Sequence, residues 1–325
     1  MIDADIAGWL AHTEAGDEPK TLAEVRERTR RTNALALSRM NPALTPPVEL
    51  DAVIDGPGGA LPIRVLRPAP TGAARPTLVY FHGGGWTVGD LDTHLGHARR
   101  LCVQAGAVVV SIGYRLAPEN RFPAAFDDAC AATEWAAQHQ HELGGAGAPL
   151  VVAGDSAGGQ LAASVAIARR DGAQRLDAQL LLYPVTDVAG RYEDAEINQH
   201  YMSRRTVRGG SGLTLLGMQN FARHYVDAAD SADWRVSPIR CADLGGVAPA
   251  VIHTATLDVL RTEGNFYGDA LRRAGVTVIS REFPTLNHSY FGLGGVSAVA
   301  ESAAAQAAED LGLLLSGSAL ATAGQ

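Results

Sequence analysis

Six short apolar runs, rich in valine, leucine and isoleucine, alternate in this chain with longer stretches of helical character. Apolar runs of strand length that are separated by helices indicate a parallel sheet covered by helices on both faces. The runs are Thr77–Phe81, Ala107–Ile112, Pro149–Ala153, Gln179–Tyr183, Pro249–Thr254 and Val276–Phe283. The chain is therefore predicted to be an α/β protein with a mostly parallel central sheet.

Three segments depart from this pattern. Residues 21–40 are predicted to form a helix, because Thr21 and Glu24 have the spacing of a capping box. Residues 48–65 alternate apolar and polar around a glycine-rich turn, which predicts an antiparallel hairpin. About fifty residues at 187–235 interrupt the strand–helix alternation and predict an inserted cap. The predicted organisation is N-terminal helices at 1–47, a first core part at 48–186, the insertion at 187–235 and a second core part at 236–325.

Charge and hydropathy exclude several classes of protein. The 325 residues carry 27 basic and 35 acidic side chains, a formal net charge of −8, and contain no long basic block. Nucleic-acid binding is therefore not expected. The apolar runs are far shorter than the ~20 residues that span a bilayer, so no membrane span is expected. The first residues show no signal-peptide pattern, and we expect a cytoplasmic protein.

Cysteine and lysine usage narrows the chemistry further. Cys102, Cys130 and Cys241 are odd in number and widely spaced, so buried free thiols are expected rather than disulfides or a structural zinc site. Lys20 is the only lysine, and it precedes every predicted strand. This position argues against a Schiff base, a Ser–Lys dyad and a phosphate-binding loop, each of which needs a lysine in the site.

Two glycine-rich strings, each directly after an apolar run, carry the strongest functional signal. Gly154-Asp155-Ser156-Ala157-Gly158 has the pattern of a nucleophile elbow, in which a serine lies on a strained strand-to-helix turn. The alternative is a merely structural turn. His82-Gly83-Gly84-Gly85 would be a flexible loop unless its exposed backbone serves a purpose. We predict Ser156 as nucleophile and the N–H groups of Gly83, Gly84 and Ala157 as donors to an oxyanion.

A serine nucleophile needs a base and an orienting acid, which follow it in the order acid, then histidine, on this kind of sheet. His288 is predicted as the base because it lies in a loop just beyond the last strand. The other candidates are His200 and His224 in the predicted cap and His253 within a strand, where a structural histidine is expected. Asp258 is preferred as the acid because its strand is adjacent in the pattern to the strand that precedes His288. Asp187, which follows the strand ending near Tyr183, is its competitor.

Metal and cofactor signals are weak. His94 and His97 are three residues apart but lack the glutamate of a HExxH motif, and His139 and His141 would point to different faces of a helix. Surface histidines are the expectation for both pairs. No dinucleotide fingerprint follows a strand. We therefore expect neither a metal nor a cofactor.

Together these residues resemble the bacterial esterases of the hormone-sensitive lipase group, within the α/β-hydrolase fold. The resemblance rests on segments His82–Trp86, Tyr114–Glu119, Phe122–Ala124, Gly154–Gly159 and Asp258–Gly264 and on His288, in family order. It implies a Ser156, Asp258 and His288 triad, an oxyanion hole of Gly83, Gly84 and Ala157, and a helical cap built by the N-terminal helices and the insertion. Tyr290 departs from the family pattern and is expected to place a hydroxyl in the pocket beside His288.

The resemblance implies hydrolysis of small short-chain acyl esters through an acyl-enzyme. An N-acetyl or lactone hydrolase with the same triad is the alternative. A third class, a non-catalytic binding protein such as the plant gibberellin receptors, is disfavoured because those receptors lack the catalytic histidine, which His288 supplies here. A homodimer is a further expectation, because dimers are common in the group.

Overall fold

The computed structural model describes residues 1–15, 21–172, 175–207 and 211–317. These residues form one eight-stranded sheet in the order β1-β2-β4-β3-β5-β6-β7-β8. The pairs β1/β2 and β2/β4 are antiparallel, and every later pair is parallel. Lys20 lies outside the described residues.

Each of the six apolar runs forms a strand, and the predicted hairpin is present. Its two strands pair from Val48 with Arg67 to Gly56 with Gly59. The last strand begins two residues later than predicted and continues to Asn287. The strands are β1 Val48–Gly56, β2 Gly59–Arg67, β3 Thr77–Phe81, β4 Val108–Ile112, β5 Leu150–Asp155, β6 Ala178–Leu182, β7 Ala250–Leu257 and β8 Val278–Asn287.

Helices connect these strands and extend the chain at both ends. The predicted N-terminal helix, α2, has its capping box: Thr21 accepts from the Glu24 N–H, and the Glu24 carboxylate accepts from the Thr21 N–H. The α-helices are α1 Ala4–Thr13, α2 Leu22–Ser38, α3 Leu95–Gln104, α4 Ala124–Gln138, α5 Gln140–Leu143, α6 Ala157–Ala168, α7 Ala195–His200, α8 Met202–Thr206, α9 Leu215–Tyr225, α10 Arg261–Arg273 and α11 Ala298–Leu315. Short 3₁₀ turns are η1 Pro42–Leu44, η2 Ala189–Tyr192, η3 Ala228–Asp230, η4 Pro238–Arg240 and η5 Tyr290–Leu293.

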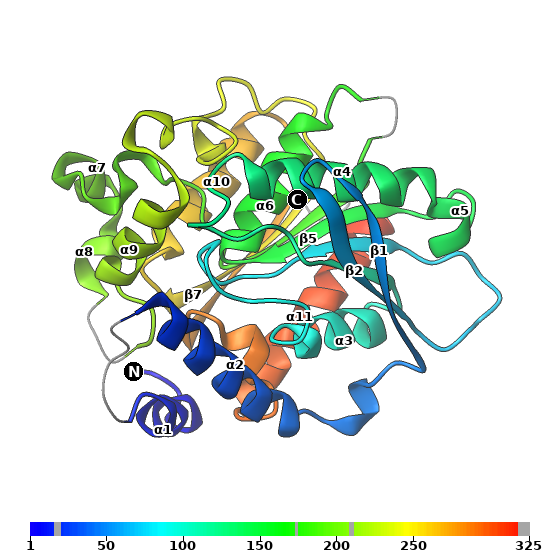
Figure 1. The fold of residues 1–325 in the computed structure, drawn as a ribbon, viewed down its shortest axis with the longest axis horizontal. Coiled ribbons are helices and arrows are strands. Elements are labelled where there is room, and N and C mark those ends of the chain that lie inside the picture. The colour runs from blue at the N-terminus through cyan, green and yellow to red at the C-terminus, as the bar shows by residue number, and fades with distance from the viewer. Residues whose placement is uncertain (16–20, 173–174, 208–210, 318–325) are drawn as a thin grey trace, which may run out of the picture.

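The sheet separates two apolar cores, as the α/β prediction requires. Successive strand residues point to opposite faces. Val79 of β3 therefore packs in the core that α4, α6 and α10 cover, whereas its neighbour Leu78 packs in the core that α3 and α11 cover. Figure 1 shows these helices on both faces of the sheet and α7–α9 grouped at one end of it. The α/β prediction with a mostly parallel sheet is confirmed.

The structure also bears on the cysteines and on the possibility of a membrane span. The cysteines are free, but only Cys102 is buried, while Cys130 and Cys241 are half-buried, so the expectation of three buried thiols is wrong for two of them. Among the described residues, no helix combines the length and the apolar character that crossing a bilayer requires.

Candidate functional site

Ser156 lies on a sharp turn between β5 and α6. Its φ of 55° and ψ of −118° are unusual for a residue with a side chain, and such strain is typical of a nucleophile elbow. The turn needs glycine nearby, because a Cβ at Gly158 would collide with the carbonyl oxygen of Phe81 on β3. The local sequence thus brings the helix against the sheet and leaves the Ser156 hydroxyl above it.

His288 and Asp258 lie within reach of this hydroxyl. His288 follows β8, and its Nε2 is 2.9 Å from Ser156 Oγ. Its Nδ1 is 2.8 Å from Asp258 Oδ2, and Asp258 follows β7. The Leu260 N–H donates to the other oxygen of Asp258 at 2.9 Å. All three predicted side chains are buried and form one hydrogen-bonded chain. Such a chain can transfer a proton from a hydroxyl to an imidazole.

The other candidates for the acid and the base are not part of this hydrogen-bonded chain. Asp187 is buried and accepts from Arg240 at 2.7 and 2.9 Å, so its carboxylate serves an ion pair. His253 is buried with Nε2 2.8 Å from Asp310, which confirms the expected structural histidine. His200 is exposed at the end of α7, and His224 is half-buried on α9.

The glycine loop after β3 differs from the expectation in one position. The N–H of Gly83 donates to Asp155 Oδ1 at 2.9 Å. This donor is occupied, so the prediction that Gly83 serves an oxyanion is wrong. Gly84 and Gly85, with φ of 117° and 55°, line the cavity above Ser156 instead. No acceptor for their N–H groups is present among the described residues.

Ala157 offers a third backbone donor. It is the first residue of α6, where an N–H has no partner within the helix. The sequence motifs did not single out Gly85 or the role of Asp155. The signal was available in principle, because an acidic residue next to the nucleophile is an obvious acceptor for one N–H of a neighbouring glycine loop.

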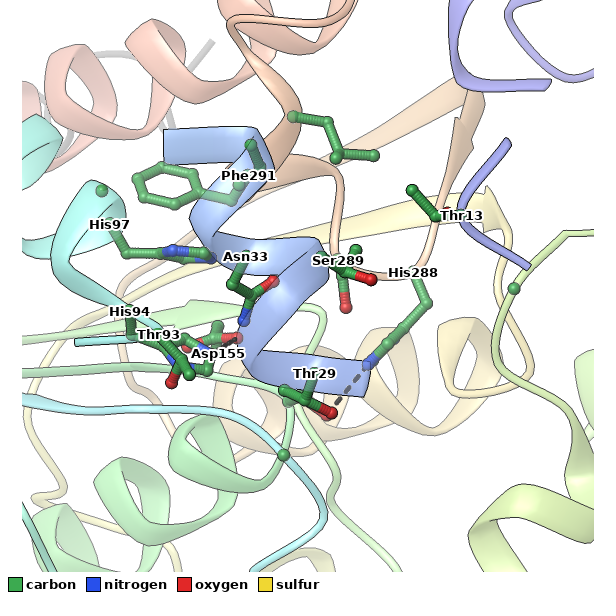
Figure 2. A pocket seen from close by; sticks show the side chains of 18 of the residues that line it. Thr13, Thr29, Asn33, Thr93, His94, His97, Asp155, His288, Ser289 and Phe291 are labelled. Carbon is green, nitrogen blue, oxygen red and sulfur yellow. Dashed lines mark hydrogen bonds and ion pairs between the residues drawn. The ribbon is translucent and has the colours of Figure 1, made fainter. Parts of the chain in front are cut away.

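Ser156 and His288 open into a cavity of about 420 Å³. Its walls include side chains of α1 and α2, Met218 and Phe221 of α9, and Phe291 of η5. Figure 2 shows Thr29 and Asn33 of α2 over this cavity, with His94 and His97 on one side and His288 on the other. The cavity is thus enclosed by segments from both ends of the sequence.

Tyr290 does not line the cavity, contrary to expectation. It is completely buried, and its hydroxyl lies 3.5 Å from His253 Nδ1 in the core. Its ring packs edge-on against Tyr183, which in turn contacts the His288 ring at 4.9 Å between centroids. Tyr290 therefore packs behind Tyr183, which contacts His288, and contributes no hydroxyl to the pocket.

His94 and His97 are also placed differently from the prediction. Both are buried, at 6% and 7% exposure, so the expectation of surface histidines is wrong for this pair. The burial follows from contacts distant in sequence, since His97 packs between Tyr80 of β3 and Phe291. Burial lowers the pKa of His97 to about 3, although the Asp155 carboxylate opposes the shift. Burial likewise holds the pKa of His94 well below its ordinary value. Both rings are therefore neutral near pH 7.

The low pKa of His97 predicts a measurable loss of stability in acid. Between pH 6.5 and about 3 the unfolded chain binds a proton at this position and the folded chain does not. Stability contributed by the neutral ring is therefore lost as pH falls, by at most about 1.4 kcal/mol per pH unit. The variant His97→Phe should show a shallower decline between pH 7.5 and 4.5 in urea unfolding. Parallel pH profiles for both proteins would contradict this assignment.

Known proteins share these features. Residues 78–292 match the sequence model of a family described as having the alpha/beta hydrolase fold. The chain is 42% identical to the carboxylic ester hydrolase LipN of Mycobacterium tuberculosis over 259 residues, which cover 76% of this chain and 66% of LipN. It is 33% identical to an ethyl acetate hydrolase of Pseudomonas putida, with 91% of this chain and 93% of that protein covered.

Solved structures agree with these relatives. The hyperthermophilic esterase of the archaeon Pyrobaculum calidifontis superposes with a TM-score of 0.86 at 33% identity. The match covers 98% of this chain and 99% of the archaeal one. The likeness therefore extends over the whole sheet and the segments that enclose the cavity.

Proposed function

Because this chain belongs to the hormone-sensitive-lipase-like esterases of the α/β-hydrolase fold, it is a serine ester hydrolase, and we propose that it cleaves short-chain carboxylic esters. The observation that carries the proposal is the hydrogen-bonded chain from Ser156 Oγ through His288 to Asp258. In this chain, Ser156 is the proposed nucleophile, His288 the base and Asp258 the orienting acid.

In the first half-reaction, Ser156 Oγ attacks the acyl carbonyl carbon while its proton passes to His288 Nε2. The Asp258 carboxylate accepts from Nδ1–H, which holds the tautomer and stabilises the imidazolium. The tetrahedral intermediate collapses, His288 protonates the departing alcohol, and the acyl group stays on Ser156. Water then attacks this ester with His288 as base, and the carboxylic acid leaves.

The negative oxygen of the intermediate needs donors that are in place beforehand. We assign this role to the N–H groups of Gly84, Gly85 and Ala157. They have no competing acceptors in the described part of the chain. The bond from Gly83 to Asp155 serves this purpose indirectly, because it anchors the loop in an orientation that exposes the next two N–H groups. Loss of one such donor typically costs about 10²–10³ in rate.

The proposed cap consists of residues 1–47 and 187–235. Residues of α1, α2 and α9 lie in the wall of the cavity, which supports this division. A cavity of about 420 Å³ must hold both the acyl and the alcohol part of a substrate. The similarity to an ethyl acetate hydrolase supports small esters as substrates. A homodimer and a cytoplasmic location stay predictions from the sequence.

A series of p-nitrophenyl esters from acetate to dodecanoate tests the substrate class. We expect kcat/KM to be highest for the two- to six-carbon acyl groups and at least about tenfold lower for the dodecanoate, because the acyl and alcohol parts share one cavity. Matched p-nitroanilides and lactones belong in the same series as controls. A preference for long chains, or for the amides or lactones, would overturn the proposal of short-chain esters.

A further inference from the structure

Beside the proposed catalytic residues lies a second cluster, whose two imidazoles have no role in the proposed reaction. His94 immediately precedes α3, His97 lies in its first turn, and Asp155 ends β5. All three are buried, and one ligand atom from each lies within 4.8 Å of the other two. Two imidazoles and one carboxylate are a donor set that proteins use for divalent transition metals.

His94 Nε2 faces a carboxylate oxygen, since it lies 3.8 Å from Asp155 Oδ2. The other ring nitrogen, Nδ1, lies 3.0 Å from the Thr93 hydroxyl. In the tautomer that is protonated at Nδ1, this nitrogen donates to the hydroxyl and Nε2 presents a lone pair beside the carboxylate. This tautomer leaves Nε2 available as a metal ligand.

The other two members are also incompletely satisfied. Asp155 Oδ1 accepts from the Tyr80 hydroxyl at 2.6 Å and from the Gly83 N–H at 2.9 Å. Within the described ranges, Oδ2 accepts from no donor, and neither nitrogen of His97 has a hydrogen-bond partner. All three residues line the cavity, and one positive ion could bind an atom of each.

We propose that His94, His97 and Asp155 form a binding site for a divalent transition metal ion, of which Zn²⁺ is the representative. Imidazole ligands favour Zn²⁺, Co²⁺ and their neighbours over Mg²⁺ and Ca²⁺, which prefer oxygen. The hydrogen bond from Thr93 supplies the outer contact that orients a ligating histidine. Arg100 also lines the cavity, but its charge is balanced by Glu301 at 2.6 and 2.8 Å.

Binding requires a modest contraction of the cluster. Zinc bonds of about 2.0–2.1 Å in a tetrahedron place ligand atoms about 3.3 Å apart. The farthest pair, now within 4.8 Å, would close by up to about 1.5 Å. We assign this movement to the His97 ring, which has no hydrogen bond to break but must shift between Tyr80 and Phe291. A water molecule would complete the coordination from the cavity side.

The position of the site connects metal binding to the proposed reaction. His94, His97, Asp155, Ser156 and His288 all line the same cavity, so a bound ion takes up space that the proposed substrate needs. Zn²⁺ should therefore inhibit ester hydrolysis reversibly. This consequence rests on the proposed function, whereas the binding of the ion does not.

Binding is tested without any catalytic readout, by Co²⁺ titration of the chelator-treated protein followed in the visible spectrum. The wild type should bind one Co²⁺ with a ligand-field spectrum that Zn²⁺ removes. His97→Phe and His97→Gln should each weaken binding at least about tenfold. The double variant His139→Gln/His141→Gln is the matched control, because it removes two histidines that lie away from the cavity. Its titration should equal that of the wild type.

Absence of Co²⁺ and Zn²⁺ binding in the wild type would overturn the proposal. Equal affinity in the wild type and a folded His97 variant would do the same. In the inhibition assay, the half-inhibitory Zn²⁺ concentration should rise at least about tenfold in the His97 variants, and a chelator should restore wild-type activity. Equal inhibition in all variants would place the inhibitory ion elsewhere. A protein that binds Co²⁺ through His97 but hydrolyses no ester would refute the proposed function and leave the metal site standing.

Discussion

Ser156→Ala should lower kcat/KM for p-nitrophenyl acetate by about 10⁴- to 10⁶-fold, because no other group can form the acyl-enzyme. The residual rate would come from binding and from the backbone donors alone. The measurement is initial-rate hydrolysis at saturating and subsaturating ester, together with labelling by a fluorophosphonate. Mass spectrometry should find the label on Ser156 in the wild type and no label in the variant.

Ser164→Ala is the matched control. Ser164 lies two turns further along the same helix, is buried like Ser156, and bonds to Gln160 and Trp234 rather than to a histidine. Its loss should leave kcat/KM within about tenfold of the wild type. A Ser156→Ala enzyme that keeps more than a hundredth of the wild-type rate would contradict the nucleophile assignment, as would labelling at another residue.

Arg204→Met should lower the free energy of unfolding by about 3–5 kcal/mol, because it leaves the buried carboxylate of Glu263 without its partner. The side chains of Arg204 and Glu263 are both completely inaccessible to solvent, and their shortest contact is 2.6 Å. The guanidinium also donates to the Asp187 carbonyl at 2.7 Å and lies over the ring of Tyr192. The pair therefore joins α8 to α10. Urea unfolding at pH 7.5 measures the change.

The adjacent Arg205 provides the control. It is exposed, and Arg205→Met should change stability by less than about 0.5 kcal/mol. Burial raises the pKa of Glu263 against the opposing effect of Arg204. Without Arg204 the folded state would take up a proton more readily than the unfolded state. The cost of Arg204→Met should therefore shrink as pH falls, and an equal cost at pH 8 and pH 5 would refute this account.

The strands and the elbow could be predicted because their signals are local. A strand such as β3 is an uninterrupted apolar run, and its identity does not depend on knowing its neighbours. Ser156 needs only its own flanking glycines and the preceding strand to be recognised. The prediction of Asp258 and His288 required one more premise, the order of residues along this type of sheet; in the structure they directly follow β7 and β8.

The errors share a physical cause, since each concerns a contact between segments distant in sequence. Gly83 looked like a free donor, but Asp155, 72 residues later, accepts its N–H. Tyr290 seemed to face the pocket, but the Tyr183 ring beside it and the hydroxyl contact with His253 hold it in the core. His97 was expected on the surface, but the rings of Tyr80 and Phe291 pack against it.

The sequence by itself determined the α/β architecture and indicated the proposed nucleophile and the order of its partners. The spacing of apolar residues and the residue types in turns act over only a few positions, so these signals are local. Only the tertiary structure decided which backbone N–H groups stay free for an oxyanion and which histidines are buried beside them. Hydrogen-bond satisfaction and burial depend on every atom that surrounds a group. For Gly83 and His97 those atoms come from β5 and η5, far along the chain.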